Sequence, residues 1–425
     1  MDVSESSTPS IRPVEQNIFN AIFHEQICPF ELQHQVQTAF VNDFKLESGE
    51  VVERAAVSFC VYGEHHPSKR LVLLHPALTG SARAMLLNNG AVANQGDGWW
   101  SSVIGPGKGF DTDNYTFVCF DHFGGHYGAC TAEDLSRQGL HGKATLADGV
   151  NLIVQFLVEQ GIESVYAVVG GSLGGGQAMK WLFQDRIDVG RIVDVSGCTA
   201  MSRNSREFFS IPADVLDKEV LLENRISLPQ RYLNHVKDLQ SFDSAITNRL
   251  IIKLHAELND LISDYSETQA LAWARKFGFL RFVTPKFFEE KYSRYLNSQA
   301  GQADAQEKAS LAVESWLDNK GDDFVQRFSS AGLQNICRMV ADSPEIKPAD
   351  LAARLLAKDS KIVSFFVKGD VLFPPEEQYP LYHASRSMAC EDRVFTIETT
   401  DEVSGHDLFL NPQFSVFVPA LMDDL

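Results

Sequence analysis

The chain has 425 residues, of which 44% are hydrophobic and 22% charged, a composition typical of a globular protein with a sizeable core. Acidic residues outnumber basic ones by 56 to 37, and the formal net charge of -19 argues against nucleic acid or an anionic membrane surface as the main partner. The length favours one large domain with an inserted subdomain, or two domains.

The cysteines and the N-terminal segment indicate the compartment. Seven cysteines are scattered with neither a C-x-x-C pair nor the spacing of metal ligands, so we expect free thiols and no metal site. The segment MDVSESSTPSIRPVEQ is polar and acidic and lacks the features of a signal or transit peptide. No apolar run reaches membrane-spanning length. We therefore expect an intracellular, cytoplasmic protein with a mobile tail at residues 1–15.

The first half of the chain alternates predicted strands and helices. The sheet is expected to begin near residue 55, with strands at 55–63, 70–78, 114–123, 164–170 and 191–198. Helices are predicted between the later strands, at 145–161 and 174–186. This alternation predicts an α/β fold with a mostly parallel sheet flanked by helices.

The pattern changes between about residues 200 and 345. Segments such as TQALAWARKFGFL and VESWLDNKGDDFVQRF show helical periodicity, and no strand-like run interrupts them. Strands resume at 361–370 and 392–400. We therefore expect a helical lid insert at 201–345 within an α/β core formed by residues 16–200 and 346–425.

The sequence VVGGSLGGGQ, residues 168–177, places a serine among five glycines between a predicted strand and a predicted helix. Residues 170–174 match G-x-S-x-G, the nucleophile elbow, in which a sharp turn exposes the serine hydroxyl and crowds its neighbours. Taken alone, the pentapeptide fits a Gly-rich turn with an incidental serine equally well. The strand and helix on either side favour Ser172 as a nucleophile.

A serine hydroxyl needs a base to take its proton and a carboxylate to orient that base. Asp370 follows a buried apolar strand, and His406 lies in a Gly-preceded loop after the last strand. Each alone fits a blander role, as a turn or cap residue and as a structural histidine. The chain order Ser, Asp, His is that of the α/β-hydrolase fold.

The tetrahedral intermediate of such a reaction needs two backbone donors. One is expected from Leu173, which follows the nucleophile, and the other from Leu78 in the loop LLHPALTGS after an early strand. His75 in the same stretch lies outside the chain order of the fold, and we interpret it as structural.

Six segments resemble, in order and spacing, the homoserine O-acetyltransferase family of α/β-hydrolase-fold enzymes: HPALTGSA, GWWSSVIGPGKGFDTDNY, GGSLGGGQAMKW, VESWLDNKGDDFVQRF, DVLFPPEEQ and GHDLFL. The resemblance runs from about residue 40 to 415. It implies that an acyl-CoA, most simply acetyl-CoA, acylates the serine as a co-substrate and that a hydroxyl acceptor then takes the acyl group. It also implies a small-molecule acceptor, no bound cofactor, and a homodimer formed through the helical insert.

The same resemblance assigns roles to five residues. Ser172 corresponds to the nucleophile, His406 to the general base and Asp370 to its orienting carboxylate. Asp407 corresponds to the residue that receives the acceptor's ammonium group, and Arg275 to the residue that binds its carboxylate. For the last two, a loop-capping Asp and a surface Arg are the alternatives.

The chain departs from the family at the expected mouth of the site. Phe282 stands where many relatives have Tyr, and residues 120–135 carry Asp121, His126 and Ala132 in place of the usual pattern. Homoserine is the favoured acceptor, as in methionine biosynthesis, but serine or a specialised metabolite and a succinyl or longer acyl donor stay open. An esterase or thioesterase is the second hypothesis. A binding or scaffold protein is the third, and the intact Ser, Asp and His set speaks against it.

Overall fold

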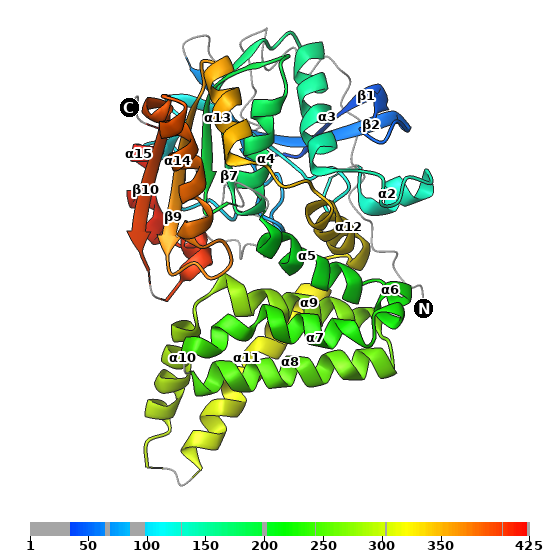
Figure 1. Cartoon of the computed structure of the whole chain (residues 1–425), viewed down its shortest axis with the longest axis vertical. Helices are drawn as coiled ribbons and strands as arrows, with labels where there is room; N and C mark the ends of the chain where they lie inside the picture. The colour runs from blue at the N-terminus through cyan, green and yellow to red at the C-terminus, as the bar shows by residue number, and fades with distance from the viewer. Residues whose placement is uncertain are drawn as a thin grey trace, which may run out of the picture.

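A computed structural model describes residues 35–63, 69–85, 98–128, 130–197, 202–242, 244–301, 304–401 and 403–422. The tail expected at residues 1–15 lies outside them. The centre of the molecule is an eight-stranded sheet of order β1-β2-β6-β3-β7-β8-β9-β10 (Figure 1). The strands are β1 (Gln37–Lys45), β2 (Val51–Tyr62), β3 (Arg70–His75), β6 (Tyr115–Phe120), β7 (Ser164–Gly171), β8 (Asp188–Val195), β9 (Lys361–Lys368) and β10 (Val394–Thr400).

From β6 to β10 neighbouring strands run parallel, whereas β1 pairs antiparallel with β2 and β2 with β6. This mostly parallel sheet flanked by helices confirms the predicted fold class. The sheet starts earlier than predicted, at Gln37 rather than near residue 55. The segment QTAFVNDFK has weak strand propensity, but it pairs with β2 along its whole length and buries Val41 and Phe44.

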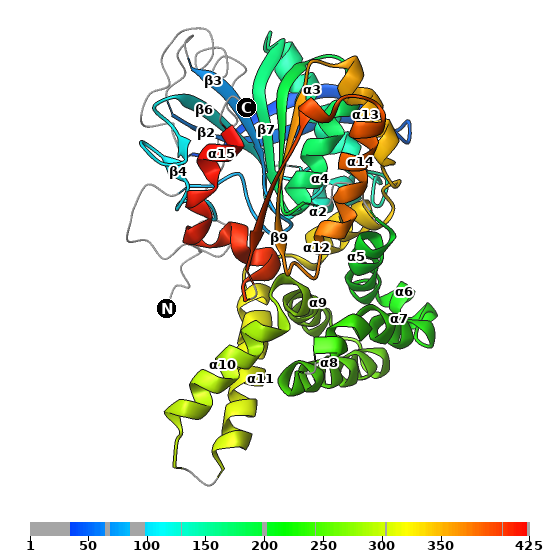
Figure 2. The ribbon, with the colours of Figure 1, turned by 60° about the vertical axis from the view of Figure 1, so that its left-hand side comes forward.

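Apolar clusters cover both faces of the sheet. On one side lie α3 (Leu146–Glu159), α4 (Leu173–Lys180), α13 (Pro348–Ala357) and α14 (Tyr379–Ser387), and on the other lies the C-terminal α15 (Val418–Met422) (Figure 2). The core also carries α2 (Ala132–Arg137) and the two-stranded ribbon of β4 (Ile104–Gly105) and β5 (Phe110–Asp111).

The helix predicted at 174–186 is shorter than expected. α4 ends at Lys180, and a 3-10 turn, Trp181–Phe183, follows it. The side-chain oxygen of Gln184 accepts hydrogen bonds from the backbone N–H groups of Arg186 and Ile187, both at 2.9 Å. These bonds satisfy the backbone in a turn and so end the helix.

Between β8 and β9 the chain forms a separate helical layer next to the sheet (Figure 1). Its helices are α5 (Arg203–Val215), α6 (Lys218–Glu223), α7 (Ser227–His235), α8 (Ala245–Ser263), α9 (Glu267–Phe282), α10 (Pro285–Ser298), α11 (Ala305–Val325) and α12 (Ser330–Ala341). α5, α9 and α12 lie nearest the core, while α10 and α11 extend away from it as a long arm (Figures 1 and 2).

Candidate active site

Ser172 sits at the sharp turn between β7 and α4. Its φ of 56° is rare for a residue with a side chain, and its backbone N–H donates to Val195 O at 2.9 Å. A Cβ at Gly170 would lie 1.9 Å from the carbonyl oxygen of Gly174, and one at Gly174 would lie 2.2 Å from that of His75. The glycines are therefore required, because any side chain there would collide with backbone.

The structure brings the predicted serine, histidine and aspartate together. Ser172 Oγ lies 2.8 Å from His406 Nε2, and His406 Nδ1 lies 2.8 Å from Asp370 Oδ2. The other oxygen of Asp370 accepts the backbone N–H groups of Leu372 at 2.8 Å and Phe373 at 2.9 Å. With Nδ1–H directed to the fixed carboxylate, Nε2 is left to accept the serine proton.

His406 lies in the 3-10 segment Gly405–Leu410, which follows β10. Trp100 holds this segment in place, since its indole N–H donates to Phe409 O at 3.1 Å. Burial by itself would lower the pKa of His406, but the negative charge and hydrogen bond of Asp370, with Asp407 and Asp194, raise it above its usual value. The site therefore favours the imidazolium that forms when the serine gives up its proton.

The two residues predicted to supply oxyanion donors lie at the same end of the sheet as Ser172. Leu173 is the first residue of α4, and the half-buried Leu78 lies on the turn that follows β3. β3 runs beside β7, with His75 paired to Gly170. Both backbone segments thus end next to the nucleophile.

His75 has the structural role that the sequence suggested. It is 2% exposed, and its Nε2 accepts the indole N–H of Trp181 at 2.8 Å. Burial, with a smaller contribution from His122, lowers the pKa of His75 to about 3. A histidine held neutral in this way is an acceptor that positions α4, not a base.

Arg275 lies on α9 in the helical layer, in an aromatic surrounding. Its guanidinium carbon is 4.6 Å from the ring centroid of Phe279, 5.1 Å from that of Phe324 and 5.6 Å from that of Phe282. Among the described residues its Nε has no hydrogen-bond partner. Burial lowers the pKa of Arg275 to about 10, with Arg327 adding to the effect. A cation in this setting is stabilised by an anionic ligand.

Asp407 directly follows His406, the predicted general base. Burial raises the pKa of Asp407 to about 6, while the positive charges of His406 and Arg275 oppose that rise. No direct ion pair joins Asp407 to Arg275 in the part of the chain that the structure describes. Their charges thus interact without a direct contact, and the negative group is the one next to His406 in the chain.

Two charged residues near the site were not picked out from the sequence. Asp194 is 1% exposed in β8, and its Oδ1 lies 2.0 Å from where a Cβ at Gly175 would be and 1.8 Å from one at Gly197. Arg327 lies with its guanidinium carbon 4.9 Å from the Phe324 ring, which Arg275 also faces. The aspartate inside the apolar strand RIVDVSGC was the available signal for the first.

The departures in residues 120–135 have structural partners. Asp121 Oδ1 accepts the backbone N–H of Ala82 at 2.7 Å, and the buried Ala132 begins α2. His126 Nδ1 accepts the backbone N–H of Ser329 at 3.1 Å, so it joins this loop to the start of α12. The changed loop thus ties the core to the helical layer.

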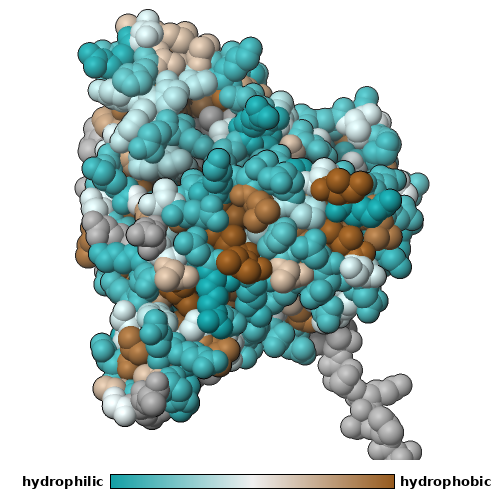
Figure 3. All heavy atoms as spheres, turned by 60° about the horizontal axis from the view of Figure 1, so that its bottom comes forward, coloured by the Kyte–Doolittle hydropathy of each residue, from teal (hydrophilic) through white to brown (hydrophobic). Residues whose placement is uncertain are grey.

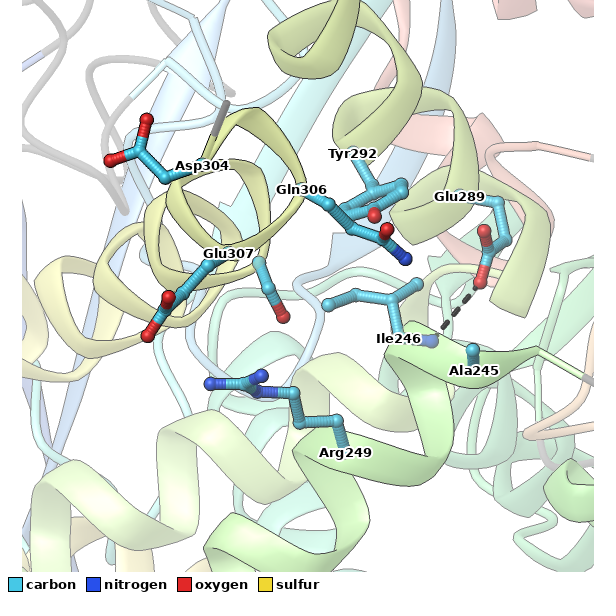
Figure 4. Close-up of a pocket in the computed structure, with 9 residues that line it drawn as sticks. Ala245, Ile246, Arg249, Glu289, Tyr292, Asp304, Gln306 and Glu307 are labelled. Atoms are coloured by element: carbon cyan, nitrogen blue, oxygen red, sulfur yellow. Dashed lines mark hydrogen bonds between the residues drawn. The ribbon is translucent and has the colours of Figure 1, made fainter. Parts of the chain in front are cut away.

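A separate open pocket of about 700 Å³ lies within the helical layer, between α8, α10 and α11 (Figure 4). Arg249 and Glu289 line it together with Tyr292 and Glu307, and none of the triad residues does. Across the described ranges, no group of three or more His, Cys, Asp or Glu residues could hold a metal ion. Nor does any helix within these ranges have the length and apolar character to cross a membrane.

No protein-family profile matches the chain. The chain is 26% identical over 374 residues to a homoserine O-acetyltransferase of Methanohalophilus mahii, and the match covers 86% of this chain and 67% of the relative. It is also 24% identical over 399 residues to a homoserine O-succinyltransferase of Alkalilimnicola ehrlichii, covering 89% of this chain and 91% of the relative.

Solved structures show the same fold. The homoserine O-acetyltransferase from Bacillus anthracis superposes with a TM-score of 0.67 at 16% identity, over 92% of this chain and 97% of that one. Esterase E22 superposes with a TM-score of 0.65 at 17% identity, over 92% and 100%. The chain thus has the α/β-hydrolase fold, and its resemblance to homoserine O-acyltransferases is confirmed over most of its length.

Proposed function

We propose that this protein is an acyl-CoA-dependent O-acyltransferase that transfers acetyl from acetyl-CoA to the hydroxyl of L-homoserine through acyl-Ser172. The observation that carries the proposal is the hydrogen-bonded series Ser172, His406, Asp370 with Asp407 and Arg275 beside it. A triad alone serves many reactions, whereas an added anion and cation favour a zwitterionic second substrate. The curated relatives are named for acyl transfer to homoserine.

In the first half-reaction, Ser172 Oγ attacks the thioester carbonyl and its proton passes to His406 Nε2. The backbone N–H groups of Leu173 and Leu78 stabilise the oxyanion of the tetrahedral intermediate. The carbon–sulfur bond then breaks, and the CoA thiolate leaves with the proton from His406. The products are free CoA and an ester on Ser172.

In the second half-reaction, the acceptor hydroxyl attacks the ester carbonyl while His406 takes the hydroxyl proton. The bond to Ser172 Oγ breaks, and the serine regains that proton. Because the acyl group stays on Ser172 after CoA has left, the acceptor reacts in a separate second step, which gives ping-pong kinetics.

The acceptor is held by its two charges. Arg275 binds the carboxylate, and its planar guanidinium suits a two-bond contact with such a group. Asp407 receives the ammonium group one residue from the base. Both groups are half-buried, so each contact is stronger than at the open surface.

We further propose that the protein is a homodimer assembled through the helical layer. α10 and α11 form an arm that extends from the body, and Figure 3 shows apolar patches on the side of the molecule that carries the layer. Exposed apolar side chains of the layer include Ile226 (85%), which precedes α7, Ile252 (70%) on α8 and Leu311 (49%) on α11. Where such side chains gather into a patch, the patch is typical of a surface covered by a partner. The described cysteines 60, 119, 130, 337 and 390 are free thiols, which suits the cytoplasm.

The test is thiol release from acetyl-CoA and succinyl-CoA, each with and without L-homoserine, L-serine and other hydroxyl compounds. Ser172→Ala provides the blank. Release from acetyl-CoA that depends on homoserine and disappears in the variant supports the proposal. Release without any acceptor indicates the esterase or thioesterase alternative, and preference for succinyl-CoA or serine corrects the donor or the acceptor.

A further inference from the structure

Phenylalanine rings pack around the imidazole of His406. The ring centroids of Phe373 and Phe409 lie 5.1 and 5.6 Å from that of His406, both edge-on. Phe282 lies at 6.2 Å with its plane tilted by 34°. Phe373 and Phe409 belong to the core, whereas Phe282 is the last residue of α9. The helical layer therefore contributes an apolar wall to the surroundings of the base.

Phe282 also faces Arg275, whose guanidinium carbon is 5.6 Å from the ring centroid. Behind it the ring packs against Phe208 at 6.2 Å and Phe279 at 6.0 Å. One half-buried ring thus contacts both the predicted carboxylate-binding cation and the predicted base. It borders the space in which the acceptor has to lie.

The backbone holds Phe282 in this place. Two residues further on, the N–H and Oγ1 of Thr284 both donate to Val403 O, at 3.2 and 3.1 Å. The packing is tight here, since a Cβ at Gly405 would lie 2.9 Å from Thr284 Cγ2. The end of α9 is therefore attached to the loop that carries His406, and the ring keeps its position relative to the base.

Acyl-Ser172 has two fates. The acceptor hydroxyl can attack the ester carbonyl, giving a new ester, or water can attack, giving a free carboxylic acid. In both cases His406 takes the proton of the attacking hydroxyl and returns it to Ser172 Oγ, so the base does not distinguish the acceptor from water. A phenyl ring offers no hydrogen bond to hold a water beside Nε2. An acceptor that is anchored by its charges needs no such hydrogen bond to stay in position.

We propose that Phe282 is the specificity-determining residue that directs acyl-Ser172 to the acceptor and away from water. The inference rests on the proposed function, since it presupposes acyl-Ser172. Phe282 acts by lining the space beside Arg275 and His406 with an apolar surface. Removing the ring admits water to the base while the triad and Arg275 stay in place.

The experiment measures two quantities with acetyl-CoA as donor. One is the lifetime of acyl-Ser172 without acceptor, followed by rapid quenching and intact-protein mass. The other is the ratio of acetylated homoserine to free acetate at saturating homoserine. The variants are Phe282→Ala and Phe282→Leu, with Phe288→Leu as the control. Phe288 is a fully buried ring on α10 that packs against Trp316 and Phe287.

We expect Phe282→Ala to shorten the acyl-enzyme lifetime and lower the transfer ratio about tenfold or more, with Phe282→Leu between it and the unmodified protein. Phe288→Leu should leave both quantities unchanged. Thermal unfolding of each variant identifies loss of folding, and Phe282→Leu keeps most of the packing volume. If both Phe282 variants form acyl-Ser172 and partition like the unmodified protein, the inference is wrong and the proposed function stands. If the unmodified protein forms no acyl-Ser172 from any acyl-CoA, both are overturned.

Discussion

The core and the helical layer contribute to the site in different ways. In the core, backbone geometry fixes the reacting atoms: the turn at Ser172 is possible because Gly170 and Gly174 lack the Cβ for which the turn leaves no room. The helical layer instead contributes side chains, Arg275 and Phe282, held by packing among aromatic rings. Under the proposed function, this difference means that the sheet would determine which reaction is possible and the layer which molecules take part.

The largest expected effect comes from the core. Ser172→Ala removes the only atom proposed to carry the acyl group, so thiol release from acetyl-CoA should fall by about 10⁶-fold, with no acyl-protein detectable by mass. Alanine keeps the Cβ of Ser172, so the strain of the positive φ is unchanged and thermal stability should change little. Substantial turnover in this variant would move the chemistry away from Ser172.

Asp370→Asn should have the next largest effect. The amide can no longer hold Nδ1–H of His406 towards it, so kcat should fall by about 10⁴-fold. The binding of substrates should change little, because the hydrogen bonds from Leu372 and Phe373 can still be accepted by the amide oxygen. A change in KM with an unaltered kcat would contradict the role assigned to the carboxylate.

Arg275→Ala tests whether the layer acts on the acceptor alone. Losing a charge-assisted contact should raise the KM for homoserine about 10- to 100-fold. The rate of acyl-Ser172 formation from acetyl-CoA should stay near that of the unmodified protein, as measured by the burst of thiol release. Arg275→Lys keeps the charge without the planar fork and should lie between the two. An equal fall in the rates of both half-reactions would contradict the proposal that Arg275 acts on the acceptor alone.

The pH dependence should also separate the two half-reactions. The pKa of His406 is raised above its usual 6.5, and only its neutral form is a base. Acyl-enzyme formation should therefore rise with pH through a midpoint above 6.5. Asp407, with a pKa of about 6, loses its charge below that pH, so the KM for homoserine should increase further there. Asp407→Asn should remove this second dependence and keep the first.

The smallest effect is expected where the two regions join. Thr284→Val keeps the backbone N–H bond to Val403 and removes the one from Oγ1. The free energy of unfolding should decrease by about 1 kcal/mol, measured by chemical denaturation. Thr284→Ser, which keeps the hydroxyl, is the matched control. A loss of several kcal/mol would mean that this contact supports the fold more widely.

The same difference explains what could be predicted from the sequence. Ser172, Asp370 and His406 were recognisable because the core imposes local requirements, namely glycines at a forced turn and polar residues directly after buried strands. Arg275 was reached only through resemblance. α9 is buried on nearly all sides, including Lys276 and Arg281, so its sequence shows no single apolar face. Asp194 was missed because its position beneath the elbow depends on how β8 packs against α4. The early start of the sheet at Gln37 likewise depends on pairing with β2.

The attachment of α9 to the His406 loop also restricts how the molecule can open. Any motion that swings the end of α9 away from the core has to break the bonds between Thr284 and Val403 or pull the loop along with it. A molecule that opens with those bonds intact therefore moves the loop of the base away from Ser172. Water that reaches the acylated serine in that opened state meets no base to activate it, so the acyl group on Ser172 would be retained.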